Sequence, residues 1–129
     1  EKIYKELSDV QVVALPGASA LTTALSLSGI SSANFVFYGF LPHKKGRETI
    51  FKKIENAEIT SVFYESVHRI EKTLESLAKI LPSTRTVVVL RELTKMHEEV
   101  VRGTVHEVEE YFKNNQGKIR GEFVVVVSA

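Results

Sequence analysis

Two short segments of this sequence gather ionisable side chains directly behind apolar runs. Residues 64–69 read Tyr-Glu-Ser-Val-His-Arg, and residues 91–95 read Arg-Glu-Leu-Thr-Lys. Charged groups at the end of a buried strand lose their hydration, so they must pair with one another or meet a ligand. Glu65 and Glu92 could accept a proton or a hydrogen bond from a reacting hydroxyl. An ion-pair network that links the two segments explains the same residues equally well.

A different kind of site could form where a turn opens a helix. The sequence Pro-Gly-Ala-Ser at 16–19 follows an apolar run and precedes a helical pattern. Free N–H groups at the start of a helix bind anionic or carbonyl groups, with Ser19 near the cap. An ordinary strand-to-helix turn is the alternative interpretation.

The charge of the chain is unevenly distributed. Its formal net charge is +1, yet the segment from His43 to Lys53 holds the cations Lys44, Lys45, Arg47, Lys52 and Lys53 against the single anion Glu48. A basic segment on an otherwise acidic chain favours contact with a polyanion. A solvated loop and helix face would show the same pattern.

The composition excludes several classes of chemistry. The chain has 129 residues, of which 43% are hydrophobic and 26% charged, and this indicates one folded domain. It has no cysteine and its four histidines fall at no metal-binding spacing, so we predict no metal site. No phosphate loop, dinucleotide fingerprint or serine elbow occurs. No apolar run approaches the roughly 20 residues that span a bilayer, and no leader opens the chain, so we expect a soluble cytoplasmic domain.

Alternating strands and helices must position these candidate residues. Short β-rich apolar runs predict strands over residues 10–15, 35–40, 59–64, 86–90 and 123–127, and apolar stripes predict helices over 18–28, 48–57, 70–81 and 105–112. Residues 96–101 are too charged for a central strand and fit an antiparallel edge. The alternation predicts the α/β class, with a mixed, largely parallel sheet of about five strands flanked by helices. Ligands of such sheets bind beyond the carboxyl ends of the strands.

Six motifs follow one another in a fixed order along the chain. They are Pro-Gly-Ala-Ser-Ala at 16–20, Gly-Phe-Leu-Pro at 39–42, Phe-Tyr-Glu-Ser-Val-His-Arg at 63–69, Arg-Glu-Leu-Thr-Lys at 91–95, Arg-Gly-Thr at 102–104 and Gly-Glu at 121–122. Together they resemble the 16S ribosomal RNA cytidine 2′-O-ribose methyltransferases, a branch of the tetrapyrrole (corrin/porphyrin) methylase superfamily. The resemblance covers the C-terminal half of that family only. Residues 1–129 are therefore expected to be a C-terminal domain that lacks the N-terminal cofactor and substrate domain.

The resemblance implies that S-adenosylmethionine binds in a cleft between the two domains. This half would supply one wall of the cleft from Ser19, Ala20, Tyr64, Glu65, Leu93 and Thr94. Glu65 and Glu92 would be the candidate catalytic residues. The candidate ligands of ribosomal RNA phosphates would be Lys44, Lys45, Arg47, Arg69 and Lys95. Ala18 and Val67 stand where the family often has proline, and this affects loop rigidity more than chemistry.

The resemblance also implies an activity and partners. The enzyme would methylate the 2′-hydroxyl of a cytidine ribose in 16S ribosomal RNA, with the small ribosomal subunit as its partner, and it would be a homodimer. On its own, this half is expected to be inactive. Two alternatives remain open, namely a small-molecule methylase of the same superfamily and a non-catalytic RNA-binding module.

Overall fold

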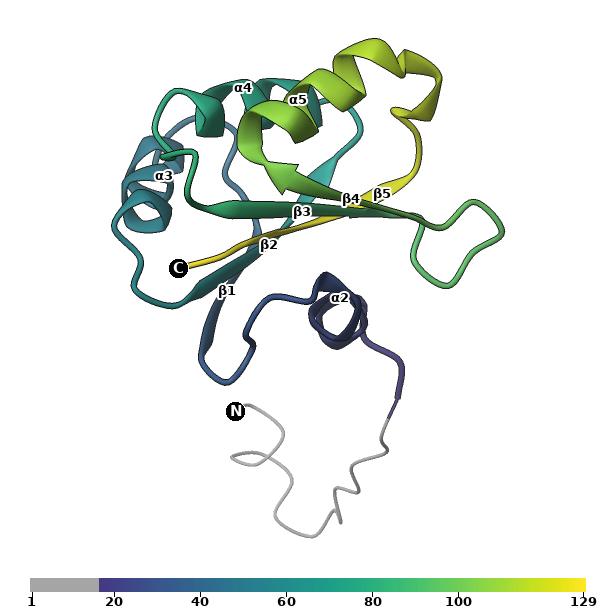
Figure 1. Ribbon diagram of the computed structural model, residues 1–129, viewed down its shortest axis with the longest axis horizontal. Helices are drawn as coiled ribbons and strands as arrows, with labels where there is room; N and C mark the ends of the chain where they lie inside the picture. The colour runs from purple at the N-terminus through teal and green to yellow at the C-terminus, as the bar shows by residue number, and fades with distance from the viewer. Residues whose placement is uncertain (1–16) are drawn as a thin grey trace, which may run out of the picture.

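A computed structural model describes residues 17–129, which form one mixed sheet with helices on both faces (Figure 1). The strands are β1 (Phe35–Phe40), β2 (Thr60–Ser66), β3 (Thr86–Arg91), β4 (Glu99–Thr104) and β5 (Glu122–Val127), in the spatial order β1-β2-β5-β3-β4. β1 and β2 pair in parallel, whereas the other three ladders are antiparallel. The predicted mixed α/β sheet of about five strands is confirmed. The expectation of a largely parallel sheet is wrong for these ladders, because β5 enters between β2 and β3 in the opposite direction.

The helices cover the two faces of the sheet unequally. The helices α3 (Arg47–Glu55), α4 (Ile70–Ala78) and α5 (Val105–Asn114) lie on one face, and α2 (Ala20–Ser28) lies alone on the other (Figure 1). A short 3-10 turn, η1 (Gln116–Lys118), follows α5. All four predicted helices are present, although α4 ends earlier than the predicted residue 81. The strand predicted over residues 10–15 lies outside the described residues.

The strand side chains build a separate core on each face. On β5, Phe123, Val125 and Val127 pack beneath the three-helix layer, while Val124 and Val126 pack beneath α2. Because both faces of β3 and β5 are covered, their sequences are continuously apolar instead of alternating. None of the helices within residues 17–129 combines the length and the apolar character that crossing a membrane requires.

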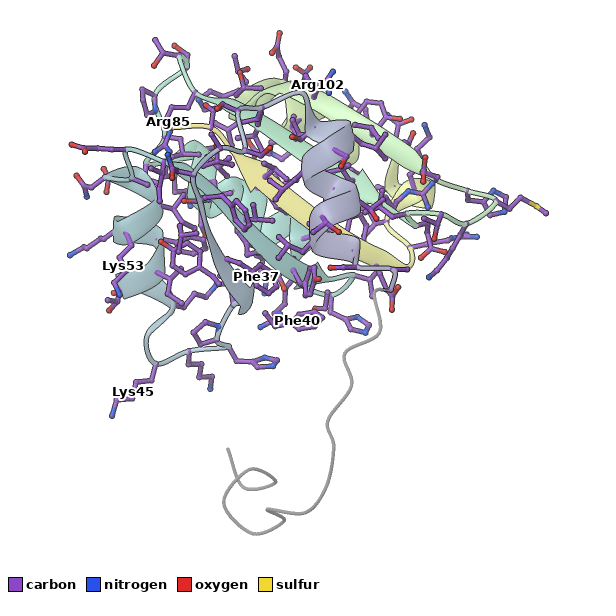
Figure 2. The ribbon with its side chains drawn as sticks, turned by 90° about the horizontal axis from the view of Figure 1, so that it is seen from below. Phe37, Phe40, Lys45, Lys53, Arg85 and Arg102 are labelled. Carbon is purple, nitrogen blue, oxygen red and sulfur yellow. The ribbon has the colours of Figure 1, made fainter. Side chains whose placement is uncertain are left out.

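Two arginines bind the carboxyl ends of helices. Arg102 on β4 donates hydrogen bonds to the carbonyl oxygens of Leu27 and Ser28 at the end of α2. Arg85 donates to the carbonyl oxygens of Ile54 and Glu55 at the end of α3 and to that of Ser128 near the chain end. A guanidinium in this position satisfies carbonyl groups that the helix leaves unpaired. Both arginines lie at the end of the sheet where β1, β2 and β3 begin (Figure 2).

The opposite edge of the sheet gathers the predicted site loops. β1, β2 and β3 run in one direction, so their carboxyl ends meet at this edge. β5 begins here, with Glu122 opposite Ser66 of β2 and Phe123 opposite Arg91 of β3. The predicted antiparallel edge strand is present as β4, which returns from this edge along β3. The topology therefore brings the loops after β1, β2 and β3 together, as the sequence predicts.

Candidate functional site

A hollow of about 370 Å³ opens where β1 and β2 end and β5 begins. It is lined by Ala20, Phe40, Tyr64, Glu65, Ser66, Val67, Gly121, Glu122, Phe123 and Val124. Its volume lies within the range of sites for small ligands. Three of the predicted cofactor residues, Ala20, Tyr64 and Glu65, line the hollow, and Ser19 directly precedes Ala20 at the N-cap of α2.

The other two predicted cofactor residues lie outside the hollow. Leu93 packs against the core beneath α2, and Thr94 is exposed in the loop after β3. Neither residue is among those that line the hollow. The hollow thus brings together the predicted residues from α2 and β2, but not those that follow β3.

The mouth of the hollow is aromatic. The ring of Tyr64 meets the ring of Phe40 edge-on at 5.4 Å between centroids, and the ring of Phe37 at 4.9 Å. Sequence reasoning placed Phe40 in a strand and in a motif, but not among the site residues. Gly39 was the available signal, because a glycine inside an aromatic strand often marks a bulge that re-aims a side chain.

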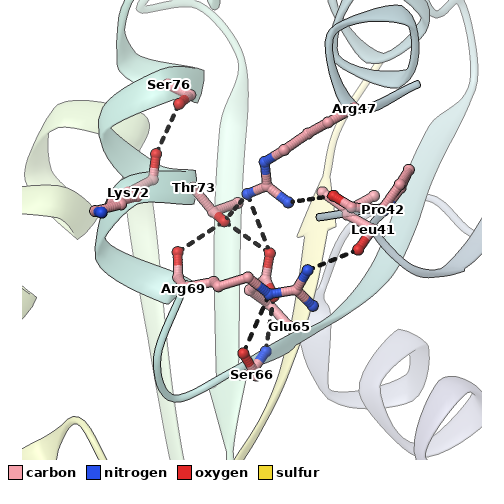
Figure 3. Close-up of polar contacts among 9 residues, drawn as sticks. All are labelled: Leu41, Pro42, Arg47, Glu65, Ser66, Arg69, Lys72, Thr73 and Ser76. Carbon is pink, nitrogen blue, oxygen red and sulfur yellow. Dashed lines mark hydrogen bonds and ion pairs between the residues drawn. The ribbon is translucent and has the colours of Figure 1, made fainter. Parts of the chain in front are cut away.

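The carboxylate of Glu65 is buried on the side of the sheet that carries α3 and α4 (Figure 3). Its Oε2 atom accepts a hydrogen bond from the Thr73 hydroxyl (2.7 Å) and pairs with Arg47 Nη2 (3.3 Å). Its Oε1 atom accepts from the Ser66 backbone N–H (2.8 Å) and pairs with Arg69 Nε (2.9 Å). Four donors saturate the acceptor capacity of a carboxylate. Glu65 is therefore the centre of an ion-pair cluster.

The two arginines of this cluster also bind the segment that follows β1 (Figure 3). Arg47 donates to the carbonyl oxygen of Pro42 (3.2 Å), and Arg69 donates to that of Leu41 (2.9 Å). Only 15% of the Arg47 side chain and 17% of the Arg69 side chain is exposed. The structure thus places these two predicted RNA ligands within the fold, where they join the ends of β1 and β2 to α3 and α4.

The loop after β3 holds the second candidate glutamate in a strained conformation. Glu92 and Thr94 both have positive φ angles, of 50° and 61°. Glu92 Oε1 accepts hydrogen bonds from the Glu122 N–H and from Lys95 Nζ, each at 3.0 Å, and the Glu92 N–H donates to the Glu122 carbonyl oxygen. The hydrogen bond from Lys95 and that from the Glu122 backbone hold the pKa of Glu92 below its ordinary value. These bonds attach the loop to the start of β5.

Gly121 is the residue that allows this attachment. Its φ angle is +80°, and a Cβ atom built on it would lie 1.9 Å from Glu92 Oε1. Only glycine therefore fits beside the Glu92 carboxylate with this backbone. Gly121 and Glu122 also line the hollow, so the Glu92 contact fixes one of its walls.

The remaining predicted RNA ligands are exposed lysines. Lys44 and Lys45 lie in the loop between β1 and α3. Lys95 forms ion pairs with Glu92 and Glu122 at 3.0 Å each, and the hydrogen bonds that it donates to these carboxylates raise its pKa. Two carboxylates surround the Lys95 charge, whereas Lys44 and Lys45 belong to the basic segment.

A further polar cluster at this edge was not anticipated from the sequence. Glu99 at the start of β4 pairs with Arg91 Nε (3.1 Å), with Lys118 and with the Tyr111 hydroxyl. Burial acts to raise the pKa of Glu99, but the hydrogen bonds from Lys118, Tyr111 and Arg91 together hold it below its ordinary value. The cluster joins β3, β4, α5 and η1 beneath the strained loop. Its members come from distant segments, so no local pattern could have identified it.

The chain matches the family model of the tetrapyrrole (corrin/porphyrin) methylases over residues 1–109. It is 44% identical, over 98% of its length, to the ribosomal RNA small subunit methyltransferase I of Bacillus subtilis (strain 168). It is also 44% identical, over 93% of its length, to the protein of the same name from Hydrogenobaculum sp. (strain Y04AAS1). The alignments cover 43% and 51% of these relatives, so the chain spans about half the length of the curated relatives it matches.

Solved structures of methyltransferases share the fold. The cobalt precorrin-4 methyltransferase CbiF matches with a TM-score of 0.65 and 14% identity, over 97% of this chain and 55% of its own. A uroporphyrin-III C-methyl transferase from Thermus thermophilus, complexed with S-adenyl homocysteine, matches with a TM-score of 0.58 and 16% identity, over 98% and 55% of the two chains. At these identities the likeness concerns the fold alone.

Proposed function

Since the chain belongs to the tetrapyrrole (corrin/porphyrin) methylase family, we propose that it is the C-terminal domain of a two-domain, S-adenosylmethionine-dependent methyltransferase. This membership confirms the family predicted from the six motifs. We further propose that the complete enzyme methylates the 2′-hydroxyl of a cytidine ribose in 16S ribosomal RNA. The observation that carries this proposal is the 44% identity, over nearly the whole chain, to a protein named ribosomal RNA small subunit methyltransferase I. The small-molecule methylases that share the fold are far less similar in sequence.

The hollow at the carboxyl edge of the sheet supports the cofactor proposal. Its apolar lining from Val67, Phe123 and Val124 suits an adenosine group, and the first turn of α2 carries no acidic side chain that would repel a carboxylate. These residues fit S-adenosylmethionine, and Ser19, Ala20 and Tyr64 would hold it. Leu93 and Thr94 remain proposed contacts from the loop after β3. When bound, the cofactor would supply a methyl group on a positively charged sulfur atom.

Positioning is the main task that the residues of this domain can perform in such a reaction. Methyl transfer requires an in-line approach of the ribose hydroxyl in a site without competing water. The saturated carboxylate of Glu65 fixes the end of β2, and the Glu92 carboxylate fixes the start of β5. We propose that both predicted catalytic glutamates contribute by holding the walls of the hollow.

The basic segment supports RNA as the substrate. Lys44 and Lys45 are exposed on the loop that follows Phe40, a residue that lines the hollow. Lysines in this position can neutralise phosphates without reading the sequence. Arg47 and Arg69 would act indirectly in RNA binding, because they hold the start of this loop through the carbonyl groups of Pro42 and Leu41. Lys95 would contribute to RNA binding from the loop after β3, at the same edge of the sheet.

We also propose that the enzyme is a homodimer and acts in the cytoplasm, where ribosomes are made. Leu27 and Ile59 each expose about two-fifths of their surface, at the end of the sheet away from the hollow. A second copy could cover these apolar side chains. Light scattering of the full-length protein at several concentrations tests the oligomeric state, and a mass that stays monomeric would contradict it.

Methyl transfer to isolated small ribosomal subunits tests the proposed activity. The full-length protein is incubated with labelled S-adenosylmethionine and subunits from cells that lack this modification. We expect one labelled 2′-O-methylcytidine after nuclease digestion and mass spectrometry of the 16S RNA. Uroporphyrinogen III serves as the competing small-molecule substrate. Label in the tetrapyrrole and none in the RNA would overturn the proposal.

A further inference from the structure

A bulge near the end of β1 turns the side chain of Phe40 to the other face of the sheet. Phe37 pairs with Val62 of β2, but Phe40 pairs with Tyr64, so three steps on β1 correspond to two steps on β2. Gly39, with φ of +64°, supplies the extra residue in the left-handed region. Regular alternation would place Phe40 on the same face as Tyr38, which packs against the three-helix core. The bulge instead places Phe40 beside Phe37 and Tyr64.

This placement leaves a large apolar ring in water. Phe40 is 65% exposed, which is more than any other phenylalanine within residues 17–129. Figure 2 shows Phe37 and Phe40 on the face that carries α2, beside that helix and not beneath it. Burial of a phenylalanine ring would stabilise the fold, so a bulge that prevents burial indicates a use for the exposed ring.

The surroundings of Phe40 indicate what its ring would meet. The ring lies at the mouth of the hollow, and the exposed cations Lys44 and Lys45 follow it in the chain within five residues. Lys45 projects from the same end of the molecule as Phe40 (Figure 2). An exposed aromatic ring next to lysines is the combination by which proteins bind unpaired nucleotides, since the ring stacks on a base while the cations neutralise phosphates.

We propose that Phe40 stacks on an unpaired base of the RNA substrate and thereby holds the neighbouring ribose at the mouth of the hollow. This inference rests on the proposed RNA substrate and names the residue that would receive the base. The Gly39 bulge and the edge-on contact with Tyr64 hold the ring in place before RNA binds. The lysines that follow it would bind the phosphates on either side of the stacked nucleotide.

The inference is tested with the full-length protein and a single-stranded cytidine decamer that carries one central 2-aminopurine. The fluorescence of this base falls when it stacks on an aromatic ring. We expect quenching by the unmodified protein and its loss in Phe40→Ala. Methyl transfer to small ribosomal subunits should fall about 5- to 150-fold in kcat/KM in this variant, the range that follows from removing a stacked aromatic ring. Phe40→Trp should retain both signals.

Phe35→Ala is the matched control, because Phe35 is a 39% exposed phenylalanine on the same strand and does not line the hollow. It should quench and transfer methyl groups like the unmodified protein. The inference fails if Phe40→Ala behaves like this control, if it loses affinity for S-adenosylmethionine without RNA, or if it changes the oligomeric mass. An unmodified protein that quenches the decamer but does not methylate RNA would disprove the proposed function and leave the stacking site standing.

Discussion

Glu65 and Glu92 occupy corresponding places in the sequence pattern but very different surroundings in the structure. Glu65 is the penultimate residue of β2 and Glu92 directly follows β3, both at the carboxyl edge of the sheet. Glu65 is buried beneath α3 and α4 and accepts from four donors, two of them arginines. Glu92 lies in a hairpin loop with a positive φ angle and accepts from one backbone N–H and one lysine. The layer of helices above a strand end therefore decides whether its carboxylate becomes a rigid buried centre or a surface anchor.

Glu65→Gln should have the largest effect on stability. The substitution keeps the shape of the side chain but leaves Arg47 and Arg69, whose side chains are only 15% and 17% exposed, without a carboxylate. Removing one partner of a buried ion pair costs about 3–5 kcal/mol, so we expect the free energy of unfolding to fall by about 3 kcal/mol. Urea unfolding followed by circular dichroism measures the change.

Glu75→Gln is the control for this comparison, because Glu75 forms an exposed pair with Lys79 on the same helix that carries Thr73. Exposed pairs contribute little, so this variant should lose less than about 0.5 kcal/mol. If the two variants lost similar amounts, Glu65 would not be the centre of a desolvated cluster, and the contrast with Glu92 would disappear.

Gly121→Ala tests the Glu92 half of the comparison and should have the second largest effect on stability. The new Cβ atom would lie 1.9 Å from Glu92 Oε1 at a φ angle of +80°. The strain and the displaced carboxylate should together cost about 2–3 kcal/mol. In a double-mutant cycle, Glu92→Ala should relieve the clash, so the combined loss should be smaller than the sum of the two single losses.

Gly117→Ala provides the matched control for that cycle. A Cβ atom on Gly117 has no neighbour within 4 Å among the described residues, and this glycine has no positive φ angle. Its replacement should change stability by less than about 0.5 kcal/mol. Strictly additive losses for Gly121→Ala and Glu92→Ala would show that the carboxylate does not depend on the glycine.

The sequence was sufficient for the helices and strands that the structure describes and for the edge that carries the candidate site, but not for the partners of its charges. Apolar periodicity identified the strands and helices because it depends on neighbours within a few residues. Arg47 and Glu65 are 18 residues apart and meet only because α3 packs beside the end of β2, so one of the five cations of the basic segment points into the fold. The exposed position of Phe40 likewise depends on a shift in strand register. Such contacts follow from topology, and spacing along the chain does not encode them.

The basic segment offers a test that separates internal from external cations. Lys44→Ala combined with Lys45→Ala should leave stability within about 0.5 kcal/mol, because both side chains are exposed. The same double variant should weaken RNA binding and flatten its salt dependence by one to two counterions. Arg47→Ala should instead lower stability by about 2 kcal/mol, because it leaves Glu65 with one cation fewer, and it should leave the salt dependence of RNA binding unchanged. If the double variant and the unmodified protein had equal salt slopes, Lys44 and Lys45 would not contact the RNA phosphates.

The smallest expected effect concerns the pH dependence that Glu92 confers. The hydrogen bonds from Lys95 and from the Glu122 N–H lower the pKa of Glu92 in the folded protein, whereas the unfolded chain has a pKa of about 4.3 for this group. The stabilisation is therefore present above the unfolded pKa and is lost as the pH falls through the folded pKa. Glu92→Gln should be slightly less stable than the unmodified protein at pH 7, and the two unfolding midpoints should converge below pH of about 4. The exposed Glu58→Gln variant serves as the control and should follow the unmodified protein throughout. The two midpoints could instead stay equally far apart at low pH. That result would show that Glu92 stabilises the loop by its shape and not by its charge, and the proposed role of Glu92 as a charged surface anchor would be wrong.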